Sequence, residues 1–414
     1  MSKEINTVVK NAIYLLSTKG LTYIFPLFVL GYLVKTLGTA SFGQYSIILT
    51  VCVYAQVVVD YGFSLTTSRE LAKQRENDEV VSTLYFETTI LKLIFVILIY
   101  PLYYFVCDFY FGESAVFSSS QIGYLLVVGN AFFPIWFFQG IERLGLVSLV
   151  NILSKLISFA LTFIFVKGQT DVTNALLVQA VPLLTLAVIC NVFIMCKFVS
   201  FRSSAISKKG MLLGIKDGWD VFVSSLSAAL LTNSAVLILG SITTESVVGI
   251  YSAAERLAKA VSALFAPITQ AIYPYNCRSF SMSIHDGFSS AKKTGIPMAF
   301  IAAITSVAIY ISSNLVGVAL DLSFESTDIL NVFAIWIFFG VVNNVLGIQI
   351  LCASSNARLY SNAFVLCSLI SVLLIFLLSY MFSGMGAAIA ITCGEMMLTC
   401  LLLLSINKMY KNLT

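Results

Sequence analysis

The feature that most constrains this chain is a series of twelve apolar stretches, each about as long as a membrane-crossing helix. Such a helix needs about 20 mainly apolar residues to cross the hydrocarbon core of a bilayer. The stretches are too long for strands, and they lack the alternation typical of a membrane barrel. The sequence therefore predicts an all-α integral membrane protein with about 12 transmembrane helices. The expected spans cover residues 11–35, 44–66, 80–105, 121–140, 146–167, 174–197, 212–239, 248–274, 294–314, 328–352, 359–382 and 385–406.

Composition excludes several classes of protein. Hydrophobic residues make up 59% of the 414 residues, charged residues make up only 11%, and the mean hydropathy is +0.94. A typical soluble domain has about 25% charged residues, so this chain has too few to build a polar shell of that kind. We therefore exclude a soluble enzyme, a nucleic-acid-binding domain and a disordered chain.

Cysteine and histidine usage argues against metal and disulfide chemistry. The chain has nine cysteines, none of them in a CxxC pair, and one histidine, His285. A zinc site or a disulfide framework needs ligands or paired cysteines at characteristic spacings, which this pattern lacks. We expect no metal, no cofactor and no catalytic residues.

The loops between the expected spans predict the orientation in the membrane. Sixteen Lys or Arg residues lie in loops on one side, and only two, Lys35 and Lys167, lie on the other. Cytoplasmic loops carry the excess of basic residues, so both termini are predicted to be cytoplasmic. The N-terminal residues lack the short apolar core and cleavage site of a signal peptide, so we expect the first span to be retained.

Two matches between the halves of the chain indicate an internal repeat. Residues 43–46 and 249–252 share the pattern GxYS, and residues 148–158 match residues 361–371. Six expected spans separate each pair, which predicts two parallel six-helix lobes, as in many transporters. Chance similarity between apolar segments is the alternative interpretation. The predicted lobes are residues 1–204 and residues 205–414.

Five cations are predicted to lie well inside the spans. Because a charge in the membrane interior is costly unless it faces a cavity or a partner, these residues are candidates for binding an anionic headgroup. Two alternatives need no ligand. Lys259 can form an ion pair with Glu255 one turn away on the same helix. The side chains of Lys19 and Lys155 can extend to the cytoplasmic surface. The five are Lys19, Lys92, Lys155, Arg256 and Lys259.

Two deep acids are candidates for proton coupling. Glu395 has no charged neighbour in its own helix, so it can carry a proton or remain a neutral acid bonded to a neighbouring helix. Asp60 is the second candidate, with Arg69 as an alternative partner near the cytoplasmic end.

Five stretches of the sequence carry recognisable motifs. They read YLVKTLGTASFGQYS at 32–46, VVDYGFSLTTSRELAK at 58–73, WFFQGIERLGLVSLVNILSK at 136–155, a longer segment at 231–278 that contains VGIYSAAERLAKA, and GMGAAIAITCGE at 384–395. In order and spacing they resemble the polysaccharide-flippase branch of the multidrug/oligosaccharidyl-lipid/polysaccharide exporter superfamily. Within that branch the sequence is most similar to the O-antigen flippases, the Wzx group.

The resemblance implies a bacterial inner-membrane flippase that serves lipopolysaccharide or related polysaccharide biosynthesis. Its substrate would be an oligosaccharide repeat unit on undecaprenyl diphosphate, moved from the cytoplasmic to the periplasmic leaflet by alternating access and coupled to an ion gradient. The expected partners are this lipid-linked oligosaccharide, the lipid bilayer, and the polymerase and chain-length regulator of the same pathway. The motifs also place four residues at the cytoplasmic mouth: Arg69, Gln139, Glu142 and Arg143.

Two alternatives compete with this interpretation. A drug or cation exporter of the same superfamily would need an acidic lumen, whereas the deep bases outnumber the deep acids here. A membrane polymerase of the same pathway would need a large outer loop. The longest expected outer loop, residues 106–120, is short and poor in catalytic residue types.

Overall fold

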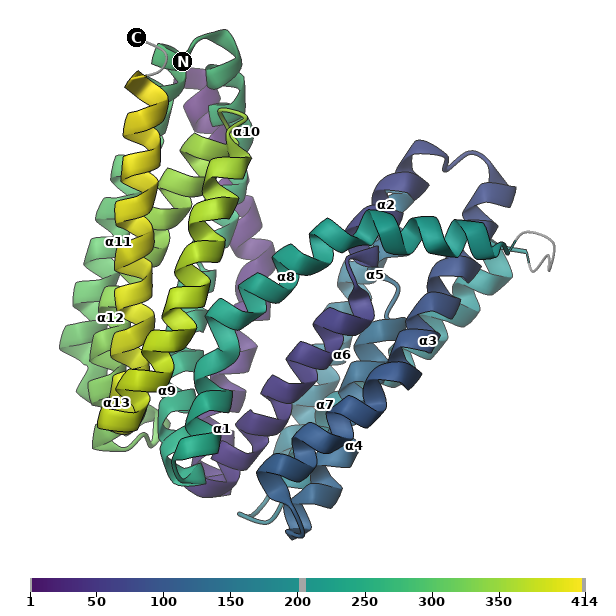
Figure 1. Cartoon of the computed structure of the whole chain (residues 1–414), viewed down its shortest axis with the longest axis vertical. Coiled ribbons are helices and arrows are strands. Elements are labelled where there is room, and N and C mark those ends of the chain that lie inside the picture. The colour runs from purple at the N-terminus through teal and green to yellow at the C-terminus, as the bar shows by residue number, and fades with distance from the viewer. Residues whose placement is uncertain (1, 201–205, 412–414) are drawn as a thin grey trace. The chain divides into compact units, whose positions relative to one another are not determined.

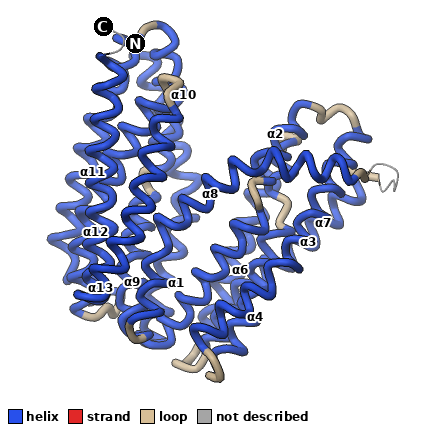
Figure 2. Tube along the Cα trace, viewed as in Figure 1, coloured by secondary structure: helices blue, strands red, loops and turns tan. Residues whose placement is uncertain are grey.

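The structure is a computed structural model that describes residues 2–200 and 206–411, with side chains from residue 27 onward except at positions 144, 146, 147 and 411. Throughout these residues it is helical, with short connections and no strand (Figure 2). The all-α prediction is therefore confirmed. The helices are α1 (Ser2–Asp60), α2 (Phe63–Lys73), α3 (Asp78–Phe111), α4 (Ala115–Phe132), α5 (Ile135–Gly140), α6 (Leu144–Phe165), α7 (Val172–Lys197), α8 (Lys208–Ile242), α9 (Glu245–Ala263), α10 (Ala266–Met282), α11 (Ile284–Leu320), α12 (Phe324–Asn344), the π-helix η2 (Val345–Cys352) and α13 (Ala357–Lys411).

Within the described residues, nine helical segments are long and apolar enough to cross a membrane. The protein is thus a multi-pass membrane protein, and every one of the predicted spans lies on helix. The count of twelve stays a prediction. It differs from nine because α1 and α13 each carry two predicted spans, and because the span at 248–274 lies on α9 and α10, which are not among the nine.

Both long helices change direction at a residue with positive φ. Gly38 in α1 has φ 72° and ψ 170°, a conformation that glycine adopts without steric cost. In α13 the break falls at Phe382 and Ser383, and Ser383 has φ 52°. Each break lies between two predicted spans, so the helix is interrupted where the sequence predicts an outer turn.

The chain forms two compact units. Unit 1 contains residues 1–43 and 234–414, and unit 2 contains residues 44–233. The boundaries fall inside α1 and α8, so both helices run from one unit into the other. The lobes predicted from the repeat, residues 1–204 and 205–414, divide the chain at one position and so differ from these two units. The two lobes remain a prediction.

Unit 2 has an aromatic core where α2, α3, α5 and α7 meet. The short helix α5 follows Pro134 and inserts Trp136, Phe137 and Phe138, each at most 3% exposed, against Leu71 and Tyr85. Burial of large aromatic side chains is a strong contribution to packing. The three aromatic residues of the WFFQG motif therefore stabilise the core of unit 2.

Unit 1 contains α9 to α13, with α12 packed between α11 and α13 (Figure 1). A separate core cluster joins α10, α11, η2 and α13 through residues that include Phe280, Leu351 and Leu402. One face of α11 exposes a row of large apolar side chains, among them Phe300, Ile304 and Ile311. Such a row suits a helix whose outer face lies against lipid tails.

Candidate functional site

Among the predicted cations whose side chains the structure describes, the most deeply buried lies in an ion pair in unit 2. Lys92, on α3, is 2% exposed, and its Nζ donates to Oδ1 of Asp60 across 2.9 Å. The same oxygen accepts a hydrogen bond from the hydroxyl of Ser64. Two residues predicted for separate roles, anion binding and proton coupling, therefore form one site. The Asp60 side chain is 38% exposed, so one side of this site remains open.

The backbone around Asp60 explains how this pair is positioned. Asp60 ends α1, and Tyr61 and Gly62 follow with φ of 47° and 84°. A side chain at Gly62 would lie 2.9 Å from the carbonyl oxygen of Gly218 on α8, so only glycine fits there. The two residues after Asp60 lead the chain into α2, and Ser64 in the first turn of α2 lies beside Asp60. Arg69, the alternative partner for Asp60, is exposed on α2, and the ion pair that the structure gives for Asp60 is with Lys92.

The other candidates of unit 2 lie apart from this pair. Lys155 is exposed on α6, and no ion pair is found for it among the described residues. Its exposure agrees with the alternative in which the side chain extends to the surface. Both interpretations of Lys155 remain open.

Unit 1 holds the two candidates of α9. Lys259 pairs with Glu255 across 3.1 Å, one turn away, and Glu255 also accepts from the hydroxyl of Tyr251 at 3.3 Å. The guanidinium of Arg256 lies 5.1 Å from the ring centre of Phe42, a cation–π contact. The backbone of Lys19 lies in α1 of the same unit, and its side chain is outside the described residues.

Glu395 lies in a hydrogen-bonded cluster between α12 and α13. The Asn343 amide donates to Glu395 Oε2 at 2.6 Å and to the Glu395 carbonyl at 2.9 Å. Thr399 donates to the Asn343 oxygen at 2.7 Å. The carboxyl group thus has a polar partner on a neighbouring helix, the arrangement expected for a structural acid, and its role in proton coupling stays a prediction.

The four residues predicted at the cytoplasmic mouth are all exposed in unit 2. Glu142 has φ 57° and forms an ion pair with Arg75, which follows α2. The guanidinium of Arg143 lies 5.2 Å from the ring centre of Phe198. Gln139 and Arg69 are exposed on α5 and α2. Because α2 packs on α5, and because the Arg75–Glu142 pair joins the loops that follow these two helices, the four residues lie on neighbouring segments of unit 2.

One buried acid was missed by the sequence analysis. Glu87, on α3, is 6% exposed, and its carboxylate accepts hydrogen bonds from the Ser207 amide and hydroxyl just before α8 begins. A side chain at Gly210 would lie 2.5 Å from the same carboxylate. Glu87 therefore stabilises the start of α8, where a negative charge is favourable. The signal was present, because Glu87 lies inside the expected span 80–105.

Metal ligands do not cluster in the part of the chain that the structure describes. Within it, no group of three or more His, Cys, Asp or Glu side chains could hold an ion. The arrangement of charges instead offers cations held by acids or aromatic rings, which can bind and release an anion without chemical conversion.

Solved structures place this fold among known transporters. One similar structure is an inward-facing multidrug resistance MATE family transporter of the MOP superfamily, with a TM-score of 0.78, 14% identity and coverage of 97% of this chain and 99% of that one. Another is the lipid II flippase MurJ in an inward closed conformation, with a TM-score of 0.77, 14% identity and coverage of 95% and 87%. The chain therefore shares the helical fold of these two proteins.

The chain belongs to the Polysaccharide biosynthesis protein family, whose model matches residues 8–280. Two curated relatives carry the name "Putative O-antigen transporter". The one from Escherichia coli (strain K12) is 29% identical over 402 residues, 96% of each chain. The one from Shigella dysenteriae is 24% identical over 401 residues, 96% of this chain and 100% of that one. The predicted family is confirmed.

Proposed function

We propose that this protein is a flippase that carries an undecaprenyl-diphosphate-linked O-antigen repeat unit from the cytoplasmic to the periplasmic leaflet of a bacterial inner membrane. The observation that carries the proposal is the match of two O-antigen transporter relatives along 96% of the chain. The family match over residues 8–280 and the transporter fold support it. The cargo would be moved and not chemically changed.

The proposed architecture has twelve spans in two parallel lobes, residues 1–204 and 205–414, with both termini in the cytoplasm. A reciprocal contact between the two GxYS motifs supports the repeat. A side chain on Gly43 would lie 1.9 Å from the carbonyl oxygen of Glu245, and one on Gly249 would lie 1.9 Å from that of Thr39. Each carbonyl belongs to the residue four positions before the opposite glycine, so the contact is the same viewed from either helix.

The buried pair of unit 2 suggests how anion binding and proton uptake are linked. In the structure, Lys92 is paired with Asp60. A diphosphate that approaches Lys92 competes with the carboxylate, since both are anions that a lysine binds. Displaced Asp60 would then lose its cation, which makes it the first candidate for coupling. Lys19, Lys155, Arg256 and Lys259 are the further candidates for the headgroup, and Glu395 is the second candidate for coupling.

Deletion of the gene in a host with a defined O-antigen tests the function. We expect loss of surface polymer and accumulation of undecaprenyl-linked repeat units on the cytoplasmic side, both reversed by a plasmid copy of the gene. Normal polymer in the deletion strain, in the absence of a second flippase gene, would contradict the proposal. The polymerase and the chain-length regulator are proposed as partners, and pull-down of either with the tagged protein tests that part separately.

A drug or cation exporter is the second candidate, because the MATE family transporter shares the fold. The pairing of charge favours the flippase: Asp60 and Glu255 each lie within 3.1 Å of a lysine, so neither offers an unmatched carboxylate to a cation. An exporter predicts that the deletion strain becomes sensitive to cationic dyes and keeps its surface polymer. The flippase predicts the opposite pattern.

A further inference from the structure

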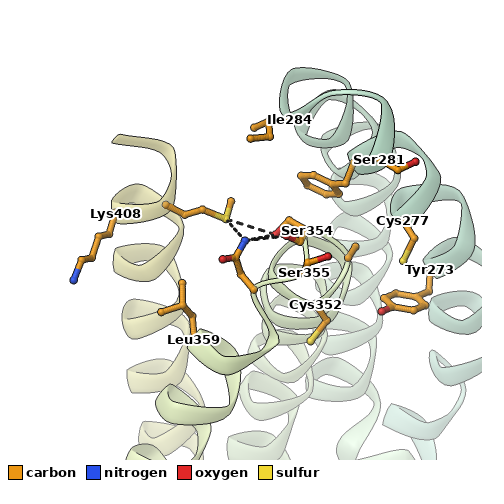
Figure 3. A pocket seen from close by; sticks show the side chains of 13 residues that line it. Tyr273, Cys277, Ser281, Ile284, Cys352, Ser354, Ser355, Leu359 and Lys408 are labelled. Atoms are coloured by element: carbon orange, nitrogen blue, oxygen red, sulfur yellow. Dashed lines mark hydrogen bonds between the residues drawn. The ribbon is translucent and has the colours of Figure 1, made fainter. Parts of the chain in front are cut away.

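A cavity of about 650 Å³ lies within unit 1, apart from all the charged candidates above. It is bounded by α10, by the turn between η2 and α13, and by the C-terminal part of α13 (Figure 3). Its volume is that of a small-molecule site. Arg278, Arg358 and Lys408 border this end of the unit, which the distribution of basic residues predicts to be cytoplasmic.

The polar wall of the cavity is preorganised by one asparagine. The Asn356 amide nitrogen donates to the Ser354 carbonyl at 2.9 Å and to the Met409 sulfur at 3.1 Å. The two side-chain N–H donors of Asn356 are therefore occupied, and the side-chain amide oxygen of Asn356 is left as an acceptor for a ligand. Ser355 adds a hydroxyl, which can donate or accept, and holds φ 64°. A non-glycine residue in this region is strained and persists where the surrounding structure requires it.

The opposite wall is aromatic and uncharged. Tyr273 and Phe280 line it from α10, and the Tyr273 ring lies on the cavity side of its helix in Figure 3. Lys408 is the one residue with a formal charge among those that line the cavity, and its ammonium group points away from the other labelled side chains (Figure 3). The site thus offers a hydrogen-bond acceptor, a hydroxyl and the flat faces of aromatic rings, and no charged group points into it that would select a charged ligand.

These features fit a neutral sugar. A pyranose ring presents hydroxyl groups that both donate and accept hydrogen bonds, and a C–H face that packs on an aromatic ring. A phosphate would need the ammonium group that points away, and a purely apolar ligand would leave the Asn356 oxygen without a partner. The π-helix η2 ends in the cavity at Cys352, and π-helical turns occur frequently at functional sites.

We propose that this cavity binds a sugar ring of the lipid-linked oligosaccharide and so contributes to cargo selection on the cytoplasmic side. The inference rests on the proposed function, because the cargo there is a saccharide. The cations proposed above for the headgroup would hold the diphosphate, and this cavity, with Tyr273 and Asn356 in its walls, would bind part of the glycan. Tyr273 and Asn356 are then specificity-determining residues.

Two native thiols make the cavity testable without new labels. Cys277 and Cys352 line it and are half-buried, whereas Cys196 is exposed at the end of α7 in unit 2. The full chain in nanodiscs is treated with N-ethylmaleimide, and modification of each cysteine is followed by peptide mass spectrometry. The probes are the methyl glycosides of galactose, mannose, rhamnose and N-acetylglucosamine, at up to about 0.1 M, which saturates a site with a Kd of about 10 mM.

We expect at least one glycoside to slow modification of Cys277 and Cys352 by about fivefold or more, with Cys196 unaffected. Tyr273→Leu should abolish this protection, and Tyr310→Leu, on the exposed face of α11, should keep it. Protection by none of the four sugars overturns the proposal. So does equal protection in both variants, or protection that follows the phosphatidylglycerol content of the nanodisc, which would identify a lipid site.

A cell assay separates failure of the cavity from failure of the proposed function. If Tyr273→Leu supports the same surface polymer as the wild type, across hosts with different repeat units, the cavity does not select cargo and the flippase function stands. If deletion of the whole gene leaves the polymer intact, the function itself fails, whatever the sugars do to Cys277.

Discussion

At the scale of single residues, the account depends on how each buried charge is matched. Lys92 is 2% exposed and relies on Asp60, 32 positions earlier in the chain. Removing one partner of a buried ion pair lowers the free energy of unfolding by about 3–5 kcal/mol. The loss is smaller here, because the Asp60 side chain is partly exposed to solvent. A variant that removes only Lys92 therefore confounds stability with function, so a paired substitution is needed.

We predict that Lys92→Met lowers both protein abundance and surface polymer, because Asp60 is left without its cation. The double variant Lys92→Met with Asp60→Asn removes both charges, so it should restore abundance to near the wild-type value and leave polymer export abolished. Immunoblotting measures the first quantity and lipopolysaccharide gels the second. Lys73→Met, which breaks an exposed pair with Glu70, is the matched control and should be silent. Export by the double variant would make the pair purely structural.

Arg256 gives a second test of anion binding. Its guanidinium stacks on Phe42, so Arg256→Gln should lose export while the protein still accumulates, with a loss of stability of about 1 kcal/mol from the cation–π contact. Lys293→Gln, which changes an exposed cation on α11 of the same unit, serves as the control. Wild-type polymer from Arg256→Gln would remove this residue from the binding site.

Glu395 is suited to a conservative substitution. In Glu395→Gln the side-chain oxygen can still accept from Asn343, so the cluster with Thr399 is kept and the thermal stability in detergent should stay within about 0.5 kcal/mol of the wild-type value. If Glu395 carries the coupling proton, export by this variant should fall and lose its dependence on the proton gradient, measured with an uncoupler. Normal, uncoupler-sensitive export would leave Glu395 a structural role.

At the scale of helices, glycines set the closest approaches. Gly43 of α1 and Gly249 of α9 meet so closely that a side chain on either would collide with the carbonyl of the other helix. Small residues at membrane helix contacts allow this kind of backbone packing. Tyr45 and Tyr251, two positions later in each motif, are fully buried, so the repeated pattern has the same structural use in both places.

We predict that Gly43→Ala lowers the melting temperature of the purified protein and reduces export, because the added carbon would meet a backbone oxygen that cannot rotate away. Gly340→Ala, in α12 with nothing within 4 Å of the added carbon, is the matched control. It should be neutral or slightly stabilising, since alanine favours helix over glycine by about 1 kcal/mol. Equal melting temperatures for the two variants would show that the contact is not needed.

The same scale explains what the sequence could and could not predict. The Lys259–Glu255 pair was foreseen as an alternative because both residues lie on one helix, where a spacing of four decides contact. The Lys92–Asp60 pair joins two helices, and no spacing rule predicts which faces meet. Glu87 could have been recognised as a deep acid from its place in an expected span, but its partner, Ser207, lies far along the chain just before α8 and could not be predicted.

At the scale of the whole molecule, the fold class followed from the length of the apolar stretches, whereas the number of spans did not. Gly38 and Ser383 interrupt their helices without ending them. The helix α9 carries Glu245, Glu255 and Arg256, so its mean hydropathy is low although it occupies a predicted span. A span that carries several charged residues is therefore the span that a count based on hydropathy most easily misses. The cavity of unit 1 was not predicted, because its walls come from three separate segments.

The central claim is that this chain moves a lipid-linked oligosaccharide across a bilayer. The purified protein is reconstituted into liposomes that hold an undecaprenyl-diphosphate-linked repeat unit, and the fraction of glycan reached by an external lectin or glycosidase is followed with time. We predict that wild-type protein makes the inner-leaflet glycan accessible and that the Lys92→Met, Asp60→Asn double variant does not. An unchanged inaccessible fraction with folded wild-type protein, under either direction of the proton gradient, would contradict the account.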